Sequence, residues 1–255
     1  MSNDLSSMLS DIAAEAPSRF DLWVEFINEI NLTSFAEIGV WRGAFAEQIL
    51  KRCPSIERYY MVDPWQHLDH WNKPANVSDR EFDDVFEQAL KRTEFAGEKR
   101  IVLRAKTSEA ILGLADAGLD AVYIDGDHTL RGITIDLVSI YDKIRPRGFI
   151  FGDDFAPSIW QHSGKFEPTF VFPLAVYFAE AKGDTIYGLP FNQFLIAKSD
   201  RSNGFQFHDL TRRYNETTLR RQLLAGPKGR ARKFVSRLRS SIVRRLHYAS
   251  PTSNR

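Results

Sequence analysis

The residues from 121 to 128 constrain the fold of this chain more than any other stretch. Ala121-Val122-Tyr123-Ile124 is a short apolar run of β-type residues, typical of a buried strand. It ends abruptly in Asp125-Gly126-Asp127-His128. In an open α/β sheet, ligands bind beyond the carboxyl ends of the strands. The stretch therefore predicts a strand that delivers two acids and an imidazole to the functional edge of a sheet.

A second apolar run ends in the same way, in Phe149-Ile150-Phe151-Gly152-Asp153-Asp154. If the two runs are neighbouring parallel strands, four carboxylates and one imidazole meet at a single edge of the sheet. So many like charges in one place cost free energy unless a cation lies among them. Hard oxygen ligands without cysteine favour Mg²⁺ or Mn²⁺ over Zn²⁺. We therefore expect a divalent metal ion at this edge.

The apolar periodicity of the rest of the chain alternates between that of strands and that of helices, which predicts an α/β fold. We expect a doubly wound, mostly parallel sheet of seven strands, at 35–40, 58–62, 101–105, 120–124, 149–152, 191–198 and 205–210. Helices are expected at 43–52, 78–93, 108–115, 131–144 and 170–181. A helical segment, 1–33, precedes this domain, 34–210, and a basic tail, 211–255, follows it.

The composition is that of a globular protein that can bury a core. Of the 255 residues, 43% are hydrophobic and 26% are charged. No apolar run approaches the roughly 20 residues that span a bilayer, and the N-terminus lacks the pattern of a secretory signal. The single cysteine, Cys53, excludes an internal disulfide framework and favours a reducing compartment. We therefore expect a cytoplasmic protein.

A turn with two glycines is expected between the first strand and its helix, at Glu37-Ile38-Gly39-Val40-Trp41-Arg42-Gly43. The glycines let the backbone turn tightly and approach a ligand, and the helix that follows offers free N–H groups. The turn lacks the middle glycine of the dinucleotide fingerprint. Asp63 closes the second strand, where an acid in nucleotide-binding folds accepts hydrogen bonds from ribose hydroxyls. The alternatives are a purely structural turn and a solvated carboxylate.

These motifs follow one another in a fixed order: E-x-G-x-x-x-G, an acid at the second strand end, Asp-Gly-Asp-His and Gly-Asp-Asp. In this order they resemble the class I S-adenosylmethionine-dependent methyltransferases. More narrowly, they resemble the metal-dependent O-methyltransferases typified by the macrocin and mycinamicin sugar enzymes, over residues 34–155 and more loosely to 198. The resemblance implies a Rossmann-like sheet, S-adenosylmethionine and Mg²⁺ as cofactors, a sugar or glycan hydroxyl as acceptor, and a homo-oligomer.

The resemblance also implies a role for each matching residue. The cofactor would be bound by Glu37, Gly39 and Gly43 at its methionine part, by Asp63 at the ribose and by Ser108 near the adenine, with Asp125 also facing it. Mg²⁺ would be bound by Asp125, Asp153 and Asp154, and His128 would be the general base. The family often has Glu-Asp where this chain has Asp153-Asp154. The shorter side chain leaves open whether that ligand contacts the metal directly or through water.

Elementary chemistry agrees with these roles. A sugar hydroxyl is a poor nucleophile at neutral pH, and a divalent ion lowers its pKa and fixes its position. His128 lies three residues after Asp125, so both can face one substrate oxygen and the imidazole can take the proton. Methyl transfer from a sulfonium is an in-line displacement that requires mainly alignment. Asp127 is expected to cap a turn or support the site, and Asp136 to lie on a solvated helix face.

Two loops at the same edge, 66–77 and 156–169, are expected to determine which acceptor binds. His67, His70 and His162 are either ordinary surface histidines or substrate contacts. Trp65 and Trp71 either stack on a sugar or adenine ring or pack beneath the loop. No pattern in either loop identifies the acceptor.

Other functions stay open on the sequence alone. Asp125-Gly126-Asp127 is also an Asp-x-Asp, the pattern with which metal-dependent glycosyltransferases hold a sugar nucleotide, but that reading leaves the glycine turn and Asp63 without a role. A nucleotide-binding oxidoreductase is disfavoured by the missing glycine. A non-catalytic member of the fold is disfavoured because every chemically needed side chain is present.

The end of the chain differs in charge from the rest. Nine of the 34 basic residues and no acid follow Leu224, which leaves a body of 25 basic and 33 acidic residues with a charge of about −8. Apolar residues recur there at helical spacing, at Phe234, Val235, Leu238, Ile242 and Leu246. Such a helix can contact an anionic membrane surface from the cytoplasm, dock on the acidic body or another subunit, or stay solvated. Nucleic-acid binding is not expected, because the body is acidic and the tail has few aromatics.

Overall fold

The computed structural model describes residues 2–199 and 204–214 and contains one sheet of eight strands in the order β3-β2-β1-β4-β5-β7-β6-β8. The strands are β1 (Ser34–Ile38), β2 (Arg58–Val62), β3 (Arg100–Leu103), β4 (Leu119–Ile124), β5 (Ile144–Gly152), β6 (Thr185–Leu189), β7 (Gln193–Ala197) and β8 (Gln206–Asp209). All neighbours are parallel except that β7 runs antiparallel to both β5 and β6. The order places the ends of β2, β1, β4 and β5 side by side.

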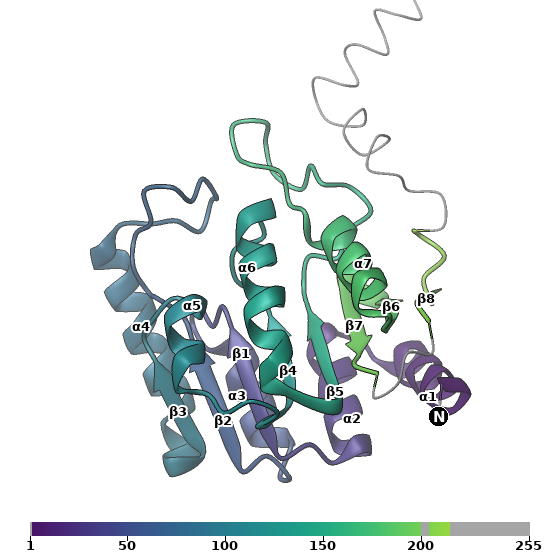
Figure 1. The fold of residues 1–255 in the computed structure, drawn as a ribbon. Helices are drawn as coiled ribbons and strands as arrows, with labels where there is room; N and C mark the ends of the chain where they lie inside the picture. The colour runs from purple at the N-terminus through teal and green to yellow at the C-terminus, as the bar shows by residue number, and fades with distance from the viewer. Residues whose placement is uncertain (1, 200–203, 215–255) are drawn as a thin grey trace, which may run out of the picture.

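Helices cover both faces of the sheet (Figure 1). They are α1 (Ser2–Glu15), α2 (Arg19–Ile30), α3 (Ala44–Arg52), α4 (Asp79–Thr93), α5 (Thr107–Ala110), α6 (Leu130–Ile140) and α7 (Val171–Lys182). Residues of α1 to α4 pack into the apolar core on one face, and residues of α5 to α7 into the core on the other. The predicted doubly wound, mostly parallel α/β fold with an N-terminal helical segment is therefore confirmed.

The structure corrects the predicted number of strands from seven to eight. The strand missed from the sequence is β6, which contains Gly188 and is followed directly by Pro190. Glycine weakens a strand in general, but here a side chain at Gly188 would come within 3.1 Å of the Tyr214 ring and 3.3 Å of the Phe155 ring. Tertiary packing, which local propensity does not report, requires the glycine.

Helix α2 is attached firmly to the middle of the sheet. The Trp23 ring is fully buried and stacks on Phe151 of β5, with 4.2 Å between ring centroids. Its Nε1 donates a hydrogen bond to Oε1 of Gln193 in β7, at 2.7 Å. Ser18 caps the helix by accepting a hydrogen bond from the Asp21 backbone. This packing brings Arg19, in the first turn, to the carboxyl edge of the sheet.

Tyr214, the last residue that the structure describes, packs into the core. This ring is buried against Phe155 and Phe172, and its backbone N–H donates to Asp209 at 2.7 Å. The remainder of the predicted basic tail, 215–255, lies outside the described residues. None of the helices in the described part is long and apolar enough to cross a membrane.

Candidate active site

A cavity of about 460 Å³ opens at the carboxyl ends of β1, β2 and β4, a volume typical of small-molecule sites. Seven of the nine predicted site residues line it: Glu37, Gly39, Asp63, Ser108, Asp125, His128 and Asp154. Gly43 and Asp153 are not in the cavity wall. The sheet order explains the grouping, because three acids follow one another on the adjacent strands β2, β1 and β4 or directly at their ends.

The two predicted glycines have different roles. Gly39 has a φ of +85°, and a Cβ there would lie 2.1 Å from the Asp125 carbonyl oxygen. Only glycine lets the β1 turn approach the end of β4 so closely. Gly43 has a φ of +73°, caps α3 and faces Ala89 of α4, whose Cα would lie 3.0 Å from an added Cβ. Gly43 thus shapes the turn from outside the cavity.

Glu37 is a buried carboxyl group in the cavity wall. Its Oε2 accepts a hydrogen bond of 2.7 Å from the Tyr59 hydroxyl. Burial raises the pKa of Glu37 well above its ordinary value, and the tyrosine contact opposes this shift. Such a group is costly when ionised alone, and a ligand ammonium group beside it would remove that cost.

Asp63 is fixed by the backbone around it. Its Oδ2 accepts hydrogen bonds from the N–H groups of Val40 and Trp41, at 2.9 and 3.0 Å, and its Oδ1 from that of Trp65, at 2.8 Å. Burial raises the pKa of Asp63, although the three N–H donors act in the opposite direction. The acid therefore ties the end of β2 to the glycine turn and still borders the cavity.

Asp136 is a cavity residue that sequence reasoning placed wrongly. It was expected on a solvated face of its helix, but it is only 4% exposed and lines the cavity with Thr107, Ser108 and Gly126. Burial raises its pKa from 3.8 to about 7, against a hydrogen bond with Thr107. The apolar stripe of α6 indicated one buried face, and no local signal marks the second face that meets the cavity.

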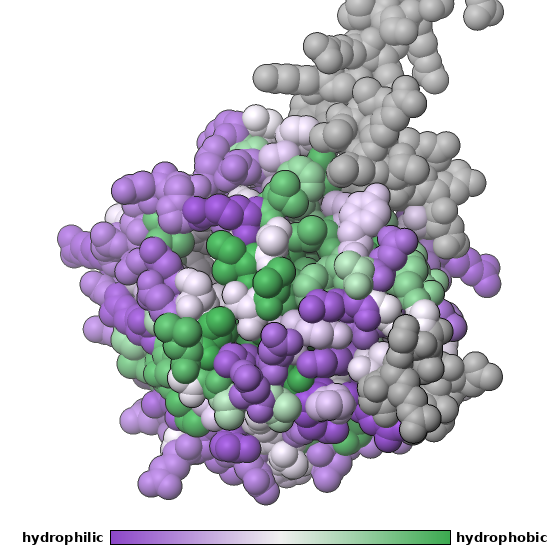
Figure 2. All heavy atoms as spheres, viewed as in Figure 1, coloured by the Kyte–Doolittle hydropathy of each residue, from purple (hydrophilic) through white to green (hydrophobic). Residues whose placement is uncertain are grey.

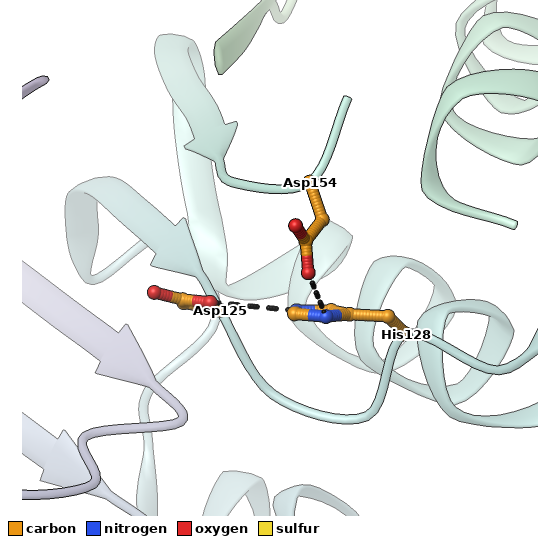
Figure 3. Close-up of side chains that lie close together, drawn as sticks. All are labelled: Asp125, His128 and Asp154. Atoms are coloured by element: carbon orange, nitrogen blue, oxygen red, sulfur yellow. Dashed lines mark ion pairs between the residues drawn. The ribbon is translucent and has the colours of Figure 1, made fainter. Parts of the chain in front are cut away.

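Asp125, His128 and Asp154 all line the cavity, and their side chains face one another (Figure 3). Nδ1 of His128 pairs with Oδ2 of Asp154, and its Nε2 lies 3.5 Å from Oδ1 of Asp125. One ligand atom from each residue lies within 4.8 Å of the others, a spacing at which the three could hold a metal ion. Burial lowers the pKa of His128, but the two carboxylates outweigh it and raise the pKa to about 10.

Arg19 supplies a cation that the sequence analysis did not find. Its Nη1 pairs with Oδ2 of Asp153 and lies 3.3 Å from Oδ2 of Asp125. Nε2 of Gln193 donates to the other oxygen of Asp153 at 2.7 Å. Asp153 therefore faces α2 and β7, apart from the triad of Asp125, His128 and Asp154. No local pattern marks Arg19, because its partners are more than 100 positions away in the chain.

The two expected loops cover the same edge of the sheet. His70, Trp71 and His162 line the cavity. Trp65 is instead fully buried beneath the loop and donates from Nε1 to the Trp41 carbonyl at 2.8 Å. His67 lies outside the lining, and its Nδ1 contacts the Val77 carbonyl at 2.9 Å.

Comparisons with known proteins agree with this geometry. A family model described as a methyltransferase domain matches residues 36–155. The interval contains the glycine turn, Asp63, Ser108 and the whole triad. Residues 36–155 are a class I S-adenosylmethionine-dependent methyltransferase domain. The search of curated proteins found no match.

Solved structures are similar to this methyltransferase in fold. A Corynebacterium glutamicum protein has a TM-score of 0.52 at 13% identity, and the match covers 77% of this chain and 92% of that protein's chain. Cofactor-bound Rv0187 from MTB has a TM-score of 0.51 at 16% identity, and the match covers 77% of this chain and 90% of the Rv0187 chain. A Staphylococcus aureus protein described as a caffeoyl-CoA O-methyltransferase has a TM-score of 0.52 at 14% identity, covering 77% and 91%.

The Asp-x-Asp reading has no support in the methyltransferase site. Asp125 faces His128 and Arg19, whereas Oδ1 of Asp127 accepts a hydrogen bond of 2.9 Å from the Thr129 backbone at the start of α6. The two acids therefore serve different partners. The expectation that Asp127 caps a turn agrees with this contact.

Proposed function

We propose that this methyltransferase transfers a methyl group to a hydroxyl of a sugar or glycosylated small molecule, with Mg²⁺ or Mn²⁺ at the triad. The observation that carries the proposal is the triad of Asp125, His128 and Asp154 in the wall of the cofactor cavity. The triad places an imidazole, which can act as a general base once it is neutral, beside two carboxylates that can bind a cation. The O-methyltransferase description of the Staphylococcus aureus neighbour supports oxygen as the atom that is methylated, and it does not bear on the sugar.

The cofactor cavity offers matching groups for S-adenosylmethionine. We assign the ammonium group of its methionine part to Glu37, whose carboxylate would gain a counterion. We assign the ribose hydroxyls to Asp63, whose orientation is fixed by three backbone N–H groups. Ser108 and Asp136 border the part left for the adenine. The bound sulfonium supplies the electrophilic methyl group, and the protein supplies alignment.

The residues of the triad fit a hard divalent cation. Two carboxylate oxygens and one imidazole nitrogen lie within 4.8 Å of one another. Carboxylate oxygens are donors that Mg²⁺ and Mn²⁺ prefer, which leaves the imidazole for the proton. We assign Asp125 and Asp154 as ligands, and propose Asp153 as a ligand only through water or after it leaves Arg19. A bound cation would act as a Lewis acid and lower the pKa of the acceptor hydroxyl.

His128 is proposed as the general base. With a pKa of about 10 it is protonated at neutral pH, so it cannot accept a proton while both carboxylates face it. A cation bound by Asp125 and Asp154 would weaken that attraction and lower the pKa of the imidazole. Nε2 would then be available to take the proton of the hydroxyl group. His128 would therefore act as a base only when the cation is bound.

Calorimetric titration of S-adenosylhomocysteine, with and without Mg²⁺, tests the cofactor assignment. We expect micromolar binding to the wild-type protein and at least tenfold weaker binding to Asp63→Ala, while the exposed Asp69→Ala keeps the wild-type affinity. Because Asp63 also holds the glycine turn, Asp63→Asn and a thermal unfolding curve serve as folding controls. No binding to the wild-type protein would contradict the proposal.

Methyl transfer to candidate glycosides tests the metal. Activity should be lost in excess chelator and restored by Mg²⁺ or Mn²⁺. Full activity in excess chelator would contradict the metal role and leave His128 to act without it. The homo-oligomer, the cytoplasmic location and the contact of the basic tail with an anionic membrane stay predictions of the sequence.

A further inference from the structure

A second hollow of about 580 Å³ lies along the first turns of α6, outside the cofactor cavity. Most of its accessible wall is apolar surface. The apolar residues in it are Leu130, Ile135, Pro168 and Phe170, and the polar and charged ones are His70, Thr129, Arg131, Thr134 and Glu167. We call this hollow the α6 groove. It is formed by α6 and the two loops that were expected to determine which acceptor binds.

The α6 groove borders the active cavity. His70, Arg131 and Ile135 line both spaces. The two spaces are therefore close enough for one molecule to have a hydroxyl group near His128 and another part in the groove.

Apolar side chains of α6 are exposed to water in the groove, where a solvated helix face usually has polar side chains. Leu130 is 52% exposed and Ile135 is 38% exposed. Figure 2 shows apolar residues gathered over α6, on the face that Figure 1 turns to the viewer. Apolar surface in water costs about 25 cal/mol per Å², and a contiguous patch of it beside an active cavity is typical of a binding surface.

Hydrogen bonds between the two loops hold the groove open. Nδ2 of Asn72 donates to the Lys165 carbonyl at 2.9 Å, and the Glu167 N–H donates to the Asn72 carbonyl at 3.2 Å. Nζ of the buried Lys73 donates to the Glu167 carbonyl and to Oγ1 of Thr169, at 2.9 and 3.0 Å. The groove wall is therefore formed before any ligand arrives, which lowers the entropy cost of binding.

A further hydrogen bond connects the groove to the proposed base. The Phe170 N–H donates to the His128 carbonyl at 2.9 Å. Phe170 forms part of the groove wall and precedes α7 directly. A ligand in the groove therefore contacts the segment that fixes the backbone of His128.

We propose that the α6 groove binds an aliphatic chain carried by the acceptor, so that the acceptor is an amphiphilic glycolipid and not a free sugar. This inference rests on the proposed function, since it needs a hydroxyl of the same molecule at His128. Aliphatic side chains form most of the apolar wall, with Phe170 the one aromatic ring in it. Such a wall suits a flexible alkyl or isoprenoid chain better than a planar ring.

The test is a chain-length series of methyl, butyl, hexyl and octyl β-D-glucosides below their micelle concentrations. Each is titrated calorimetrically into the protein saturated with S-adenosylhomocysteine. We expect affinity to rise about two- to fourfold for each added methylene, as for partial burial of a chain. An affinity that does not depend on chain length would overturn the proposal.

Two variants on one helix locate the chain. Leu130→Glu places a charge in the groove, and we expect it to remove the dependence on chain length. An acidic residue in the first turn of a helix is favourable, so the variant should fold. Val138→Glu is the matched control, because Val138 lies on α6, is 59% exposed and does not line the groove. An unchanged series in Leu130→Glu would show that the chain binds elsewhere and would overturn the proposal.

Failure of the groove and failure of the proposed function give different results. Absence of a chain-length effect in the wild-type protein, together with normal S-adenosylhomocysteine binding, contradicts the groove alone. Absence of S-adenosylhomocysteine binding contradicts the proposed function, and the glucoside series without it still decides whether the groove takes a chain.

Discussion

The two sides of the active cavity stabilise their carboxylates in different ways. On the cofactor side, Glu37 and Asp63 accept hydrogen bonds from a buried phenol and from backbone N–H groups. On the acceptor side, Asp125, Asp153 and Asp154 pair with the side-chain cations Arg19 and His128, which come from α2 and from the loop before α6.

The difference indicates which side can change its partners. Backbone N–H groups and a packed phenol stay in place, so the cofactor side is preorganised for one ligand. Side-chain cations can be displaced by another cation without unfolding an element of structure. The proposed acceptor side therefore permits exchange: a divalent ion bound there would balance the negative charge that Arg19 and His128 now balance.

Removal of an acceptor-side carboxylate should have the largest effect. Loss of a residue that only supports a metal ligand costs about 10- to 100-fold in affinity, and loss of a direct ligand should cost at least about 1,000-fold. We therefore expect Asp125→Ala to abolish Mn²⁺ binding in a titration followed by electron paramagnetic resonance.

Asp116→Ala is the matched control for this variant. Asp116 is exposed, and its carboxylate pairs with Lys143 far from the cavity. Its removal should leave Mn²⁺ affinity unchanged. Equal affinity in the wild-type protein and Asp125→Ala would place the metal outside the triad and break the comparison between the two sides.

The buried acid of the cofactor cavity should give the next largest effect, on stability. The pKa of Asp136 is about 7 in the folded chain, against 3.8 as its ordinary value. A raised pKa in an acid means that the folded chain binds the proton more tightly. This stabilisation is complete below about pH 4 and is lost as the pH rises through 7, on the order of 4 kcal/mol at most.

Urea unfolding of the wild-type protein and Asp136→Asn at pH 5 and pH 8 measures this contribution. The free energy of unfolding of the wild-type protein should fall more between these pH values than that of Asp136→Asn. Asp116→Asn should follow the wild-type protein, since its carboxyl group is exposed. Parallel pH dependences in the wild-type protein and Asp136→Asn would show that Asp136 is ionised without penalty.

The contrast between Asp136 and Ser78 shows how far the sequence predicts this molecule. The capping box of Ser78 and Glu81 depends on residues only three apart, and it forms at the start of α4, where the helix 78–93 was predicted. The strand-end acids were also predictable, because apolar runs followed by Asp and Gly mark the functional edge of a sheet. Asp136 was not, because its burial depends on Thr107 and Gly126, which belong to other elements.

Arg19 and β6 were missed for the same physical reason. The guanidinium reaches Asp125 and Asp153 only because Trp23 docks α2 on the sheet. Gly188 is acceptable in a strand only because the Tyr214 ring occupies the space beside it. Both the position of Arg19 and the strand β6 depend on contacts between residues far apart in the sequence, and short-range sequence patterns do not predict such contacts.

Glu37→Gln tests the cofactor side with a smaller expected effect. Glutamine keeps the shape of the side chain and can still accept the Tyr59 hydrogen bond, but it has no charge for the ligand ammonium group. A hydrogen bond to a charged group contributes about 1.5–3 kcal/mol, so S-adenosylhomocysteine affinity should fall about 10- to 100-fold. Calorimetry with Glu57→Gln, an exposed glutamate just before β2, is the control.

The pH dependence of the same titration sharpens this test. Burial raises the pKa of Glu37 well above its ordinary value, so at any pH below that raised pKa its carboxyl group releases a proton when an ammonium group binds beside it. The affinity of the wild-type protein should therefore rise with pH, more steeply than that of Glu37→Gln. Equal slopes would mean that another group receives the ammonium.

Arg19→Gln should give the smallest effect and is the most direct test of exchange on the acceptor side. Arg19 and Asp125 are both partly exposed, so water screens their attraction and the pair contributes little. Removal of the competing cation should tighten Mn²⁺ binding by about three- to tenfold, because about 1 kcal/mol corresponds to fivefold. Arg52→Gln is the control. Arg52, at the end of α3, pairs at 2.8 Å with Asp21, which lies on α2 as Arg19 does. Weaker Mn²⁺ binding in Arg19→Gln would mean that Arg19 orders the carboxylates for the metal, and the acceptor side would then be as preorganised as the cofactor side.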